Sequence, residues 1–257
     1  MVKLSYGENG RGAWSVTGVG GTLQLDRLKN VTKPGPYYMA PVNSTYMIGL
    51  QVSKDIAAGK IITIDNYAVY LGVKEIQKRL NQVLGANLTV DGIIGPRTDS
   101  WIKGLQYHLG VVQDGMLGPA TASALFVPIV QSEAKKLGVD WKVPAGILKK
   151  ECSFDPAAVG YEDPNDNGMG QINRIAHPEY TVEQCFDSII TIRYAINRYT
   201  KALKDWGNVR DAVASYNLGY AGTREWISKG RPDIWTPSWD NKPRNTKKYI
   251  DDIVYAF

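Results

Sequence analysis

The chain has 257 residues, of which 44% are hydrophobic and 21% are charged. This composition excludes extensive disorder, and the length allows two or three small domains. The net charge is +5, with 12 basic and 8 acidic residues in 1–128 and 18 and 17 in 129–257. The excess of positive charge therefore lies in the first half. Because it is diffuse and no run of five basic residues exists, we expect no nucleic-acid partner.

Cysteine content and hydropathy narrow the class further. Cys152 and Cys185 are too few for a disulfide framework, so we expect two reduced, buried thiols. The N-terminal residues lack the apolar core of a cleavable secretory signal. No stretch reaches the roughly 18 apolar residues of a spanning helix, so we expect no membrane span.

Residues 1–72 are expected to form a small β-rich domain. Glycines are dense near the start, and two runs rich in β-branched and aromatic residues follow, at 46–54 and 60–71. The short DIAAG segment between them favours a β-hairpin. The region holds no catalytic constellation, so its expected role is docking or assembly.

Residues 73–127 contain an internal repeat of the form DGxxGPxT, which begins at Asp91 and again at Asp114. Asp-Gly favours a tight turn with a positive φ, and proline favours the first helical position. Helical spacing before and between the copies predicts a three-helix module. The faces expected to be apolar carry Val73, Ile76, Leu80, Val83 and Leu84 in the first helix, and Trp101, Leu105, His108 and Leu109 in the second.

This module resembles the family of peptidoglycan-binding domains that pair helices with repeated DGxxGPxT turns. The resemblance implies binding to glycan strands or stem peptides of the bacterial cell wall. The Asp, Gly and Pro residues of the repeats are expected to shape turns. His108 is expected in the core or at the surface, and not as a metal ligand.

Residues 128–257 are expected to be mostly helical, and one acid stands out among them. On a helix beginning near Val143, Glu151 shares a face with Ile147 and Leu148. Burial raises the pKa of a carboxyl group, and a carboxylic acid that is protonated near neutral pH can donate a proton to a glycosidic oxygen. By position alone, a glutamate such as Glu151 is more often a solvated charge at a helix end.

Four ordered motifs resolve this ambiguity: ECSFDPAAVG, NDNGMGQIN, AVASYNLGYAG and TKKYIDDIV. They resemble those of the lysozyme-like lytic transglycosylases of the soluble-transglycosylase type, found in phage and bacterial wall-cleaving proteins. The resemblance identifies Glu151 as the single catalytic acid. It implies substrate-binding roles for Met169, Gln171, Tyr216, Asn217 and Tyr249. It implies no metal and no organic cofactor.

Two positions depart from the family pattern. Cys152 stands where the family has serine after the glutamate, which puts a hydroxyl hydrogen bond in doubt. Gly170 stands where the family has methionine, which opens space at that point of the cleft.

The reaction implied by the resemblance breaks the MurNAc-β-1,4-GlcNAc bond and leaves a 1,6-anhydro end. Trp226, Trp235 and Trp239 are candidates for stacking on sugar rings, or they pack a long loop. If Glu162, Asp163 or Asp166 held a water in the cleft, the enzyme would instead be a hydrolytic muramidase. Asp155 is expected to cap a turn before Pro156.

The sequence thus predicts a mainly α, multidomain protein. Its expected parts are a β-rich domain (1–72), a peptidoglycan-binding module (73–127) and a lysozyme-like transglycosylase domain (128–257). We expect a virion-associated phage lysin whose residues 1–72 contact other phage structural proteins. The alternatives are an endolysin that reaches the wall from the host cytoplasm through a holin, and a non-enzymatic wall-binding protein of the virion.

Overall fold

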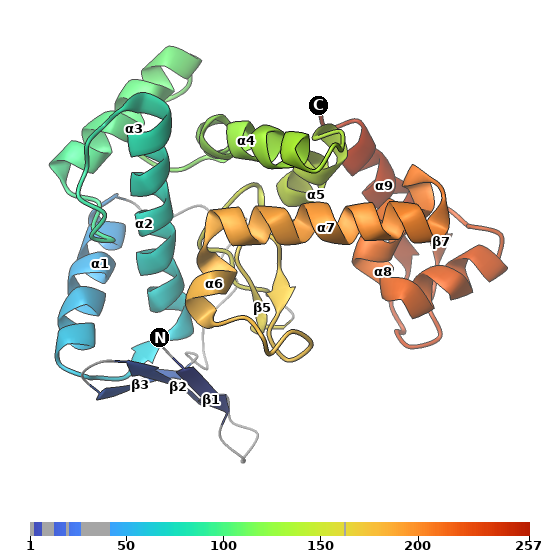
Figure 1. Ribbon diagram of the computed structural model, residues 1–257, viewed down its shortest axis with the longest axis horizontal. Coiled ribbons are helices and arrows are strands. Elements are labelled where there is room, and N and C mark those ends of the chain that lie inside the picture. Colours follow the sequence, from blue (N-terminus) through green and yellow to red (C-terminus); the bar gives the residue numbers. More distant parts are fainter. Residues whose placement is uncertain (1–2, 7–12, 19–20, 27–41, 162) are drawn as a thin grey trace. The chain divides into compact units, whose positions relative to one another are not determined.

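The computed structural model describes residues 3–6, 13–18, 21–26, 42–161 and 163–257, with side chains from residue 47 onward. The chain is mainly helical, as predicted (Figure 1). Its helices are α1 (Val42–Ala57), α2 (Ile64–Leu84), α3 (Pro96–Leu109), α4 (Pro119–Lys136), α5 (Lys142–Cys152), α6 (Val182–Phe186), α7 (Ser188–Trp206), α8 (Val209–Ser228) and α9 (Thr246–Val254). Its strands are β1 (Lys3–Tyr6), β2 (Ala13–Gly18), β3 (Gly21–Asp26), β4 (Ile62–Thr63), β5 (Asp166–Asn167), β6 (Ile172–Asn173), β7 (Ile234–Trp235) and β8 (Arg244–Asn245).

The chain forms two compact units. Unit 1 comprises Met1–Phe126 and Cys152–Thr191, and unit 2 comprises Val127–Glu151 and Ile192–Phe257. The expected boundaries at 72/73 and 127/128 fall inside α2 and α4. The division into three domains therefore stays a prediction.

The N-terminal strands form a sheet in the order β1-β2-β3-β4, antiparallel except for the parallel pair β3–β4. The hairpin expected over residues 46–71 is wrong, because these residues lie mostly in α1 and α2. The two helices lie side by side (Figure 1). Their β-branched and aromatic residues serve a buried helical interface, which overrides strand propensity.

Helix α2 begins and ends at residues that suit those positions. The Thr63 side chain accepts a hydrogen bond from the backbone N–H of Asn66, which satisfies one of the free donors of the first turn. Gly85 ends the helix in the left-handed conformation with φ 65°. Val73, Ile76 and Leu80 are fully buried, as predicted, whereas Val83 is 40% exposed.

Each copy of the DGxxGPxT repeat is held by a buried glutamine from the preceding helix. In the first copy, Gln77 Nε2 donates to Asp91 Oδ1 (2.8 Å) and its Oε1 accepts from the N–H of Gly92 (2.9 Å). In the second copy, Gln106 makes the same two bonds to Asp114 and Gly115, at 2.8 and 2.9 Å. Both turn glycines have a positive φ, 77° and 75°, and both prolines open a helix, as predicted.

In the second helix of the module, the buried face differs from the predicted apolar face by one residue. Ile102 and Leu105 are buried, whereas His108 and Leu109 are exposed. His108 therefore lies at the surface, which is one of the two places expected for it.

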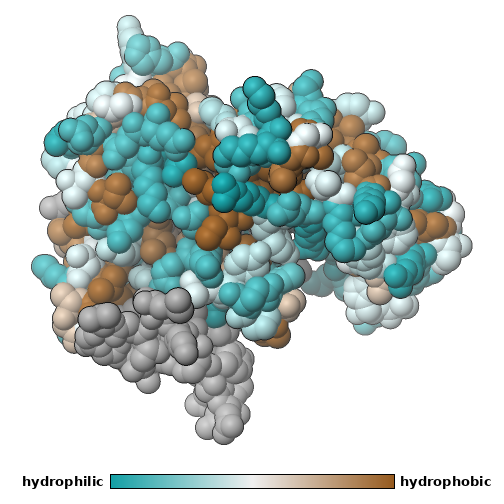
Figure 2. All heavy atoms as spheres, in the orientation of Figure 1, coloured by the Kyte–Doolittle hydropathy of each residue, from teal (hydrophilic) through white to brown (hydrophobic). Residues whose placement is uncertain are grey.

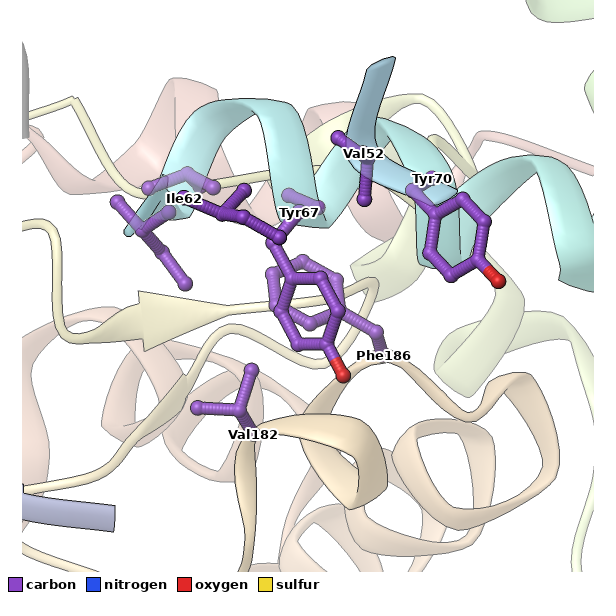
Figure 3. Packing of buried hydrophobic residues seen from close by; sticks show 9 residues of the cluster. Val52, Ile62, Tyr67, Tyr70, Val182 and Phe186 are labelled. Atoms are coloured by element: carbon purple, nitrogen blue, oxygen red, sulfur yellow. The ribbon is translucent and has the colours of Figure 1, made fainter. Parts of the chain in front are cut away.

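A hydrophobic cluster joins α1 and α2 to the 152–191 segment of unit 1. Tyr67 lies over Phe186 and Val182 in this cluster (Figure 3). Its buried members are Val52, Ile62, Ile64, Tyr67, Ala68, Tyr70, Val159, Val182 and Phe186. The N-terminal helices and this segment therefore share one core.

Unit 2 is built from α5, α7, α8, α9 and the end of α4, with the two-stranded ribbon β7–β8. Helix α5 lies directly against α9, because a Cβ atom at Gly146 would lie only 2.2 Å from the carbonyl oxygen of Ile253. Gly219 interrupts α8 with φ 67° and ψ 174°, a conformation that favours glycine, and the helix continues beyond it to Ser228. The core of this unit includes Ile147, Leu148, Ile192, Ile196, Val213, Trp226 and Ile253.

Hydrophilic residues cover much of the face in Figure 2, with hydrophobic residues scattered among them. None of the helices that the structure describes is long and apolar enough to cross a bilayer. Both cysteines are free and buried, as expected.

Candidate active site

The catalytic acid expected from the motifs meets a tyrosine in unit 2. Glu151 is the penultimate residue of α5 and is partly buried. The hydroxyl of Tyr249, on α9, donates a hydrogen bond of 2.5 Å to Glu151 Oε1. The close contact of α5 with α9 at Gly146 brings the two side chains together. The structure thus joins two of the residues that the sequence singled out, 98 positions apart.

The environment of Tyr249 keeps its hydroxyl protonated. Burial raises the pKa of Tyr249 well above its ordinary value, and the negative charge of Glu151 and the hydrogen bond to it raise that pKa further. A tyrosine in this state is a permanent donor to the carboxyl group. The bond therefore fixes the orientation of Glu151.

Tyr216, on α8, is buried beside a cation that the motifs did not indicate. The guanidinium of Arg198, on α7, lies 4.3 Å from the centre of the Tyr216 ring and donates to the Tyr216 backbone carbonyl (3.0 Å). It also donates to the Tyr194 hydroxyl (3.3 Å). The positive charge of Arg198 lowers the pKa of Tyr249, although burial and Glu151 dominate that pKa. Arg198 thus belongs to the surroundings of the acid.

The sequence gives a weak signal for the contact between Tyr194 and Arg198. Tyr194 and Arg198 are four residues apart on a long predicted helix, so they share a face. The same face carries the buried Ala195 and Tyr199 nearby, but nothing in the helical pattern marks Arg198 as close to Glu151.

Asn217 points away from this group. Its side chain is exposed, and its Oδ1 accepts a long hydrogen bond from Arg244 (3.5 Å). The kink at Gly219 follows two residues later. Asn217 therefore takes part in surface contacts between α8 and β8, while its neighbour Tyr216 is buried.

Met169 and Gln171 lie in unit 1, on the turn before β6. Met169 is 1% exposed, so its side chain packs in the interior. Gln171 has φ 47°, a rare conformation for a residue with a side chain, and its Nε2 donates to the Gly168 carbonyl (2.8 Å). Gly168 is required, because a Cβ atom there would lie 1.7 Å from the Cys185 carbonyl oxygen.

Cys152, at the position where the family has serine, faces the interior. It is 6% exposed, and its thiol lies 3.5 Å from the Met169 carbonyl oxygen, which accepts a weak hydrogen bond. The thiol therefore ties the end of α5 to the turn that carries Gln171. Ser153 and Phe154 follow with φ 55° and 61°, so the chain reverses sharply just after the acid.

The loop acids that compete for a catalytic role bind side-chain amides. Asn173 Nδ2 donates to both Asp163 Oδ2 and Asp166 Oδ1, each at 2.9 Å. Asp163 Oδ1 accepts two further bonds from Asn165. Asp163 and Asp166 thus stabilise the loop around β5 and β6. Glu162 lies outside the described residues.

Asp155 caps a turn, as predicted. Its Oδ1 accepts a hydrogen bond from the N–H of Ala157 (2.8 Å). Burial raises the pKa of Asp155 to about 7.

The three candidate tryptophans differ in exposure. Trp226 is fully buried and donates to the Pro232 carbonyl (2.9 Å), while Trp235 donates to Thr246 Oγ1 (2.9 Å). Trp239 is 50% exposed and meets Trp235 edge-on, with ring centres 5.7 Å apart. Of the three, Trp239 is the one whose ring reaches the surface.

Within the described part of the chain, no three His, Cys, Asp or Glu side chains are grouped so that they could hold a metal ion.

Comparisons with known proteins agree with the motifs. Residues 71–125 match the family of peptidoglycan binding domains, and residues 128–233 match the transglycosylase SLT domain family. The chain is 28% identical over 146 residues to membrane-bound lytic murein transglycosylase F of Desulfosudis oleivorans. That similarity covers 51% of this chain and only 32% of the relative's length. No solved structure matches the chain significantly.

The two family matches confirm both resemblances. Residues 71–125 thus match a peptidoglycan binding domain and residues 128–233 a transglycosylase SLT domain.

Proposed function

We propose that the protein is a peptidoglycan lytic transglycosylase in which Glu151 is the catalytic acid. The observation that carries the proposal is the 2.5 Å hydrogen bond from Tyr249 to Glu151, at the end of a helix whose motif matches the family. A partly buried carboxyl group with one oxygen held by a permanent donor is suited to present its other oxygen to a substrate.

The reaction needs one carboxyl group used twice. Glu151 protonates the oxygen between MurNAc and GlcNAc, and the bond from that oxygen to the anomeric carbon of MurNAc breaks. The acetamido group of MurNAc stabilises the positive charge at this carbon. The 6-hydroxyl of the same sugar then attacks the carbon, and the Glu151 carboxylate accepts the hydroxyl proton. The products are a 1,6-anhydro end and a free GlcNAc hydroxyl, and no water is consumed.

Tyr249 orients the carboxyl group of Glu151, and Arg198 positions Tyr216. Neither residue exchanges protons in this scheme. The Tyr249 hydroxyl keeps its proton, because its pKa lies far above neutrality. Its hydrogen bond orients the carboxyl group through both steps. Arg198 positions Tyr216 through its ring and its backbone carbonyl.

The substrate class follows from the first module as well as from the second. A peptidoglycan binding domain over residues 71–125 favours insoluble wall as the substrate. It would raise the local concentration of glycan strands near the transglycosylase domain.

The test is the release of soluble material from purified cell walls by wild type and Glu151→Gln. We expect clearing by wild type and a loss of at least about 100-fold in the variant, since the glutamine cannot donate a proton. Equal and negligible release by both would leave a non-enzymatic wall-binding protein.

We propose further that the protein acts on the wall from a phage virion, with its N-terminal strands as the docking part. The support is that residues 1–70 lie outside both family matches. Detection of the protein in purified particles would support this setting. Its absence from particles, with lysis that depends on a holin, would favour an endolysin.

A further inference from the structure

Residues 42–70 belong to neither family match, yet they contribute six of the nine buried residues of a core shared with the transglycosylase segment. Val159, Val182 and Phe186 of that segment pack against residues of α1, β4 and α2 (Figure 3). The hydroxyl of Tyr67, on α2, donates to Glu183 Oε1 at 2.8 Å. The transglycosylase segment therefore buries its apolar residues against helices outside its own family boundaries.

A close backbone approach adds a second contact. Gly72, on α2, lies so near Ala157 that a Cβ atom would come within 2.7 Å of the Ala157 Cβ. Helix α2 and the turn after Asp155 are therefore in direct contact, and any side chain at position 72 would push them apart.

A buried carboxylate makes the third contact. Glu75, on α2, is 3% exposed, and its Oε2 accepts from the backbone N–H of Ser188 (3.1 Å) and from the Ser188 hydroxyl. Its Oε1 pairs with Lys78 (2.5 Å). Ser188 is the first residue of α7, where an anion stabilises free N–H groups and the helix dipole. Glu75 thus caps α7 from another helix.

These contacts lie on the helix that also holds the first DGxxGPxT turn. Gln77 clamps the Asp91–Gly92 turn, and Glu75, two residues earlier, caps α7. Helix α7 also carries Arg198. Met169 and Gln171 lie in the segment between Ala157, which Gly72 contacts, and the start of α7 at Ser188.

We propose that α2 is a shared support of both modules, and that Glu75 and Tyr67 are positioning residues for the transglycosylase reaction. The helix is then needed for cleavage itself as well as for wall binding. This inference rests on the proposed function. It also gives Tyr67 and its neighbours in the shared core a part in cleavage, where this region of the chain was expected to serve docking or assembly.

The test separates cleavage from wall binding by using a soluble, uncross-linked glycan strand as substrate. Glu75→Gln removes one of two carboxylates at the start of α7, since Asp187 Oδ1 also accepts from the N–H groups of Ile189 and Ile190. Tyr67→Phe removes one hydroxyl while keeping the ring in the core. We expect each variant to lower kcat by roughly tenfold, since small displacements of a site cost rate steeply, with little change in KM. Hydrogen exchange is expected to rise at the first turn of α7 and in residues 163–173, and not throughout the chain.

Asp55→Asn is the matched control, because Asp55 is a carboxylate of α1 whose side chain contacts the nearby Gln51 and Lys60. It is expected to cleave like wild type. If Glu75→Gln fails to fold, Tyr67→Phe still decides. Wild-type kcat in Tyr67→Phe and in any folded Glu75→Gln would overturn the inference, whereas an inactive wild type would overturn the proposed function instead.

Discussion

Glu151 and Tyr249 have different roles in the proposed reaction, and the position and surroundings of each residue account for the difference. Glu151 lies at the end of a helix where its face is partly apolar. Tyr249 is held protonated by burial and by the carboxyl group that it contacts. In the proposed reaction, the tyrosine therefore acts as a fixed donor, and the glutamate is the group that exchanges the proton.

Replacing Tyr249 with phenylalanine tests this division. The variant keeps the ring but leaves the carboxyl group free to rotate, so kcat on soluble glycan is expected to fall by about 10- to 100-fold with KM nearly unchanged. Tyr255→Phe is the control, because Tyr255 follows the same helix and is 81% exposed. Equal kcat in the two variants would show that the hydrogen bond has no catalytic role.

Asp155 makes a prediction about stability and pH. Its pKa is raised to about 7 by burial, so the folded protein holds a proton that the unfolded chain releases near pH 4. The free energy of unfolding should therefore fall as pH rises from about 4 to 7, by as much as about 4 kcal/mol. Asp155→Asn keeps an oxygen for the Ala157 N–H, so the variant should lose this slope and be more stable than wild type at pH 7.

Denaturant unfolding at several pH values measures the slope. Asp140→Asn is the control, because Asp140 makes the same kind of bond to the Lys142 N–H (3.0 Å) from an exposed position. Parallel stability curves for wild type and Asp155→Asn between pH 4 and 8 would contradict the account.

At the level of single residues, motif order predicted Glu151 and Tyr249, and the structure brings them together. Arg198 was not predicted, because a helical pattern places a residue on a face but does not say which distant side chain that face meets. Met169 was expected to bind substrate, and its side chain is buried. Burial of this kind depends on tertiary packing, which spacing does not reveal.

At the level of elements, the kink in α8 sets the direction of the chain after Tyr216 and Asn217. Gly219 has φ 67° and ψ 174°, a region that is essentially restricted to glycine, and no atom lies within 4 Å of an added Cβ. Gly219→Ala should thus destabilise the fold by about 1–3 kcal/mol through backbone strain alone.

The matched substitution is Gly104→Ala, in the middle of α3, where an added Cβ also meets nothing within 4 Å. It should stabilise the protein by up to about 1 kcal/mol, because alanine is the better helix former. Thermal unfolding of both variants measures the difference, and shifts of the same sign would refute the role given to Gly219.

The elements also show where local patterns succeed and fail. The turn chemistry of the DGxxGPxT repeats was predictable, since glycine and proline have strong local preferences. The glutamines that clamp the turns were not predicted. Gln77 precedes Asp91 by 14 residues, and Gln106 precedes Asp114 by 8. Residues 46–71 read as strands because their β-branched and aromatic side chains suit a sheet, but the core with Val182 and Phe186 is served by helices.

At the level of the whole molecule, the two modules that match known families are joined by helices that cross the expected boundaries. Helix α2 holds the first repeat turn and caps α7, and α4 continues through residue 128. The sequence motifs of both modules resemble the families whose models match the chain. They missed the shared core, because contacts between distant segments leave no periodic signal in either one.

If Glu151 promotes attack by the substrate's own 6-hydroxyl, as we propose, no oxygen from water enters the products. Purified walls would be digested in water enriched in heavy oxygen, and the muropeptides would be weighed by mass spectrometry, with Glu151→Gln as the inactive control. We predict anhydro ends, each lighter than a reducing end by one water, with no heavy oxygen incorporated. Reducing ends that carry heavy oxygen would contradict the account and identify a hydrolytic muramidase.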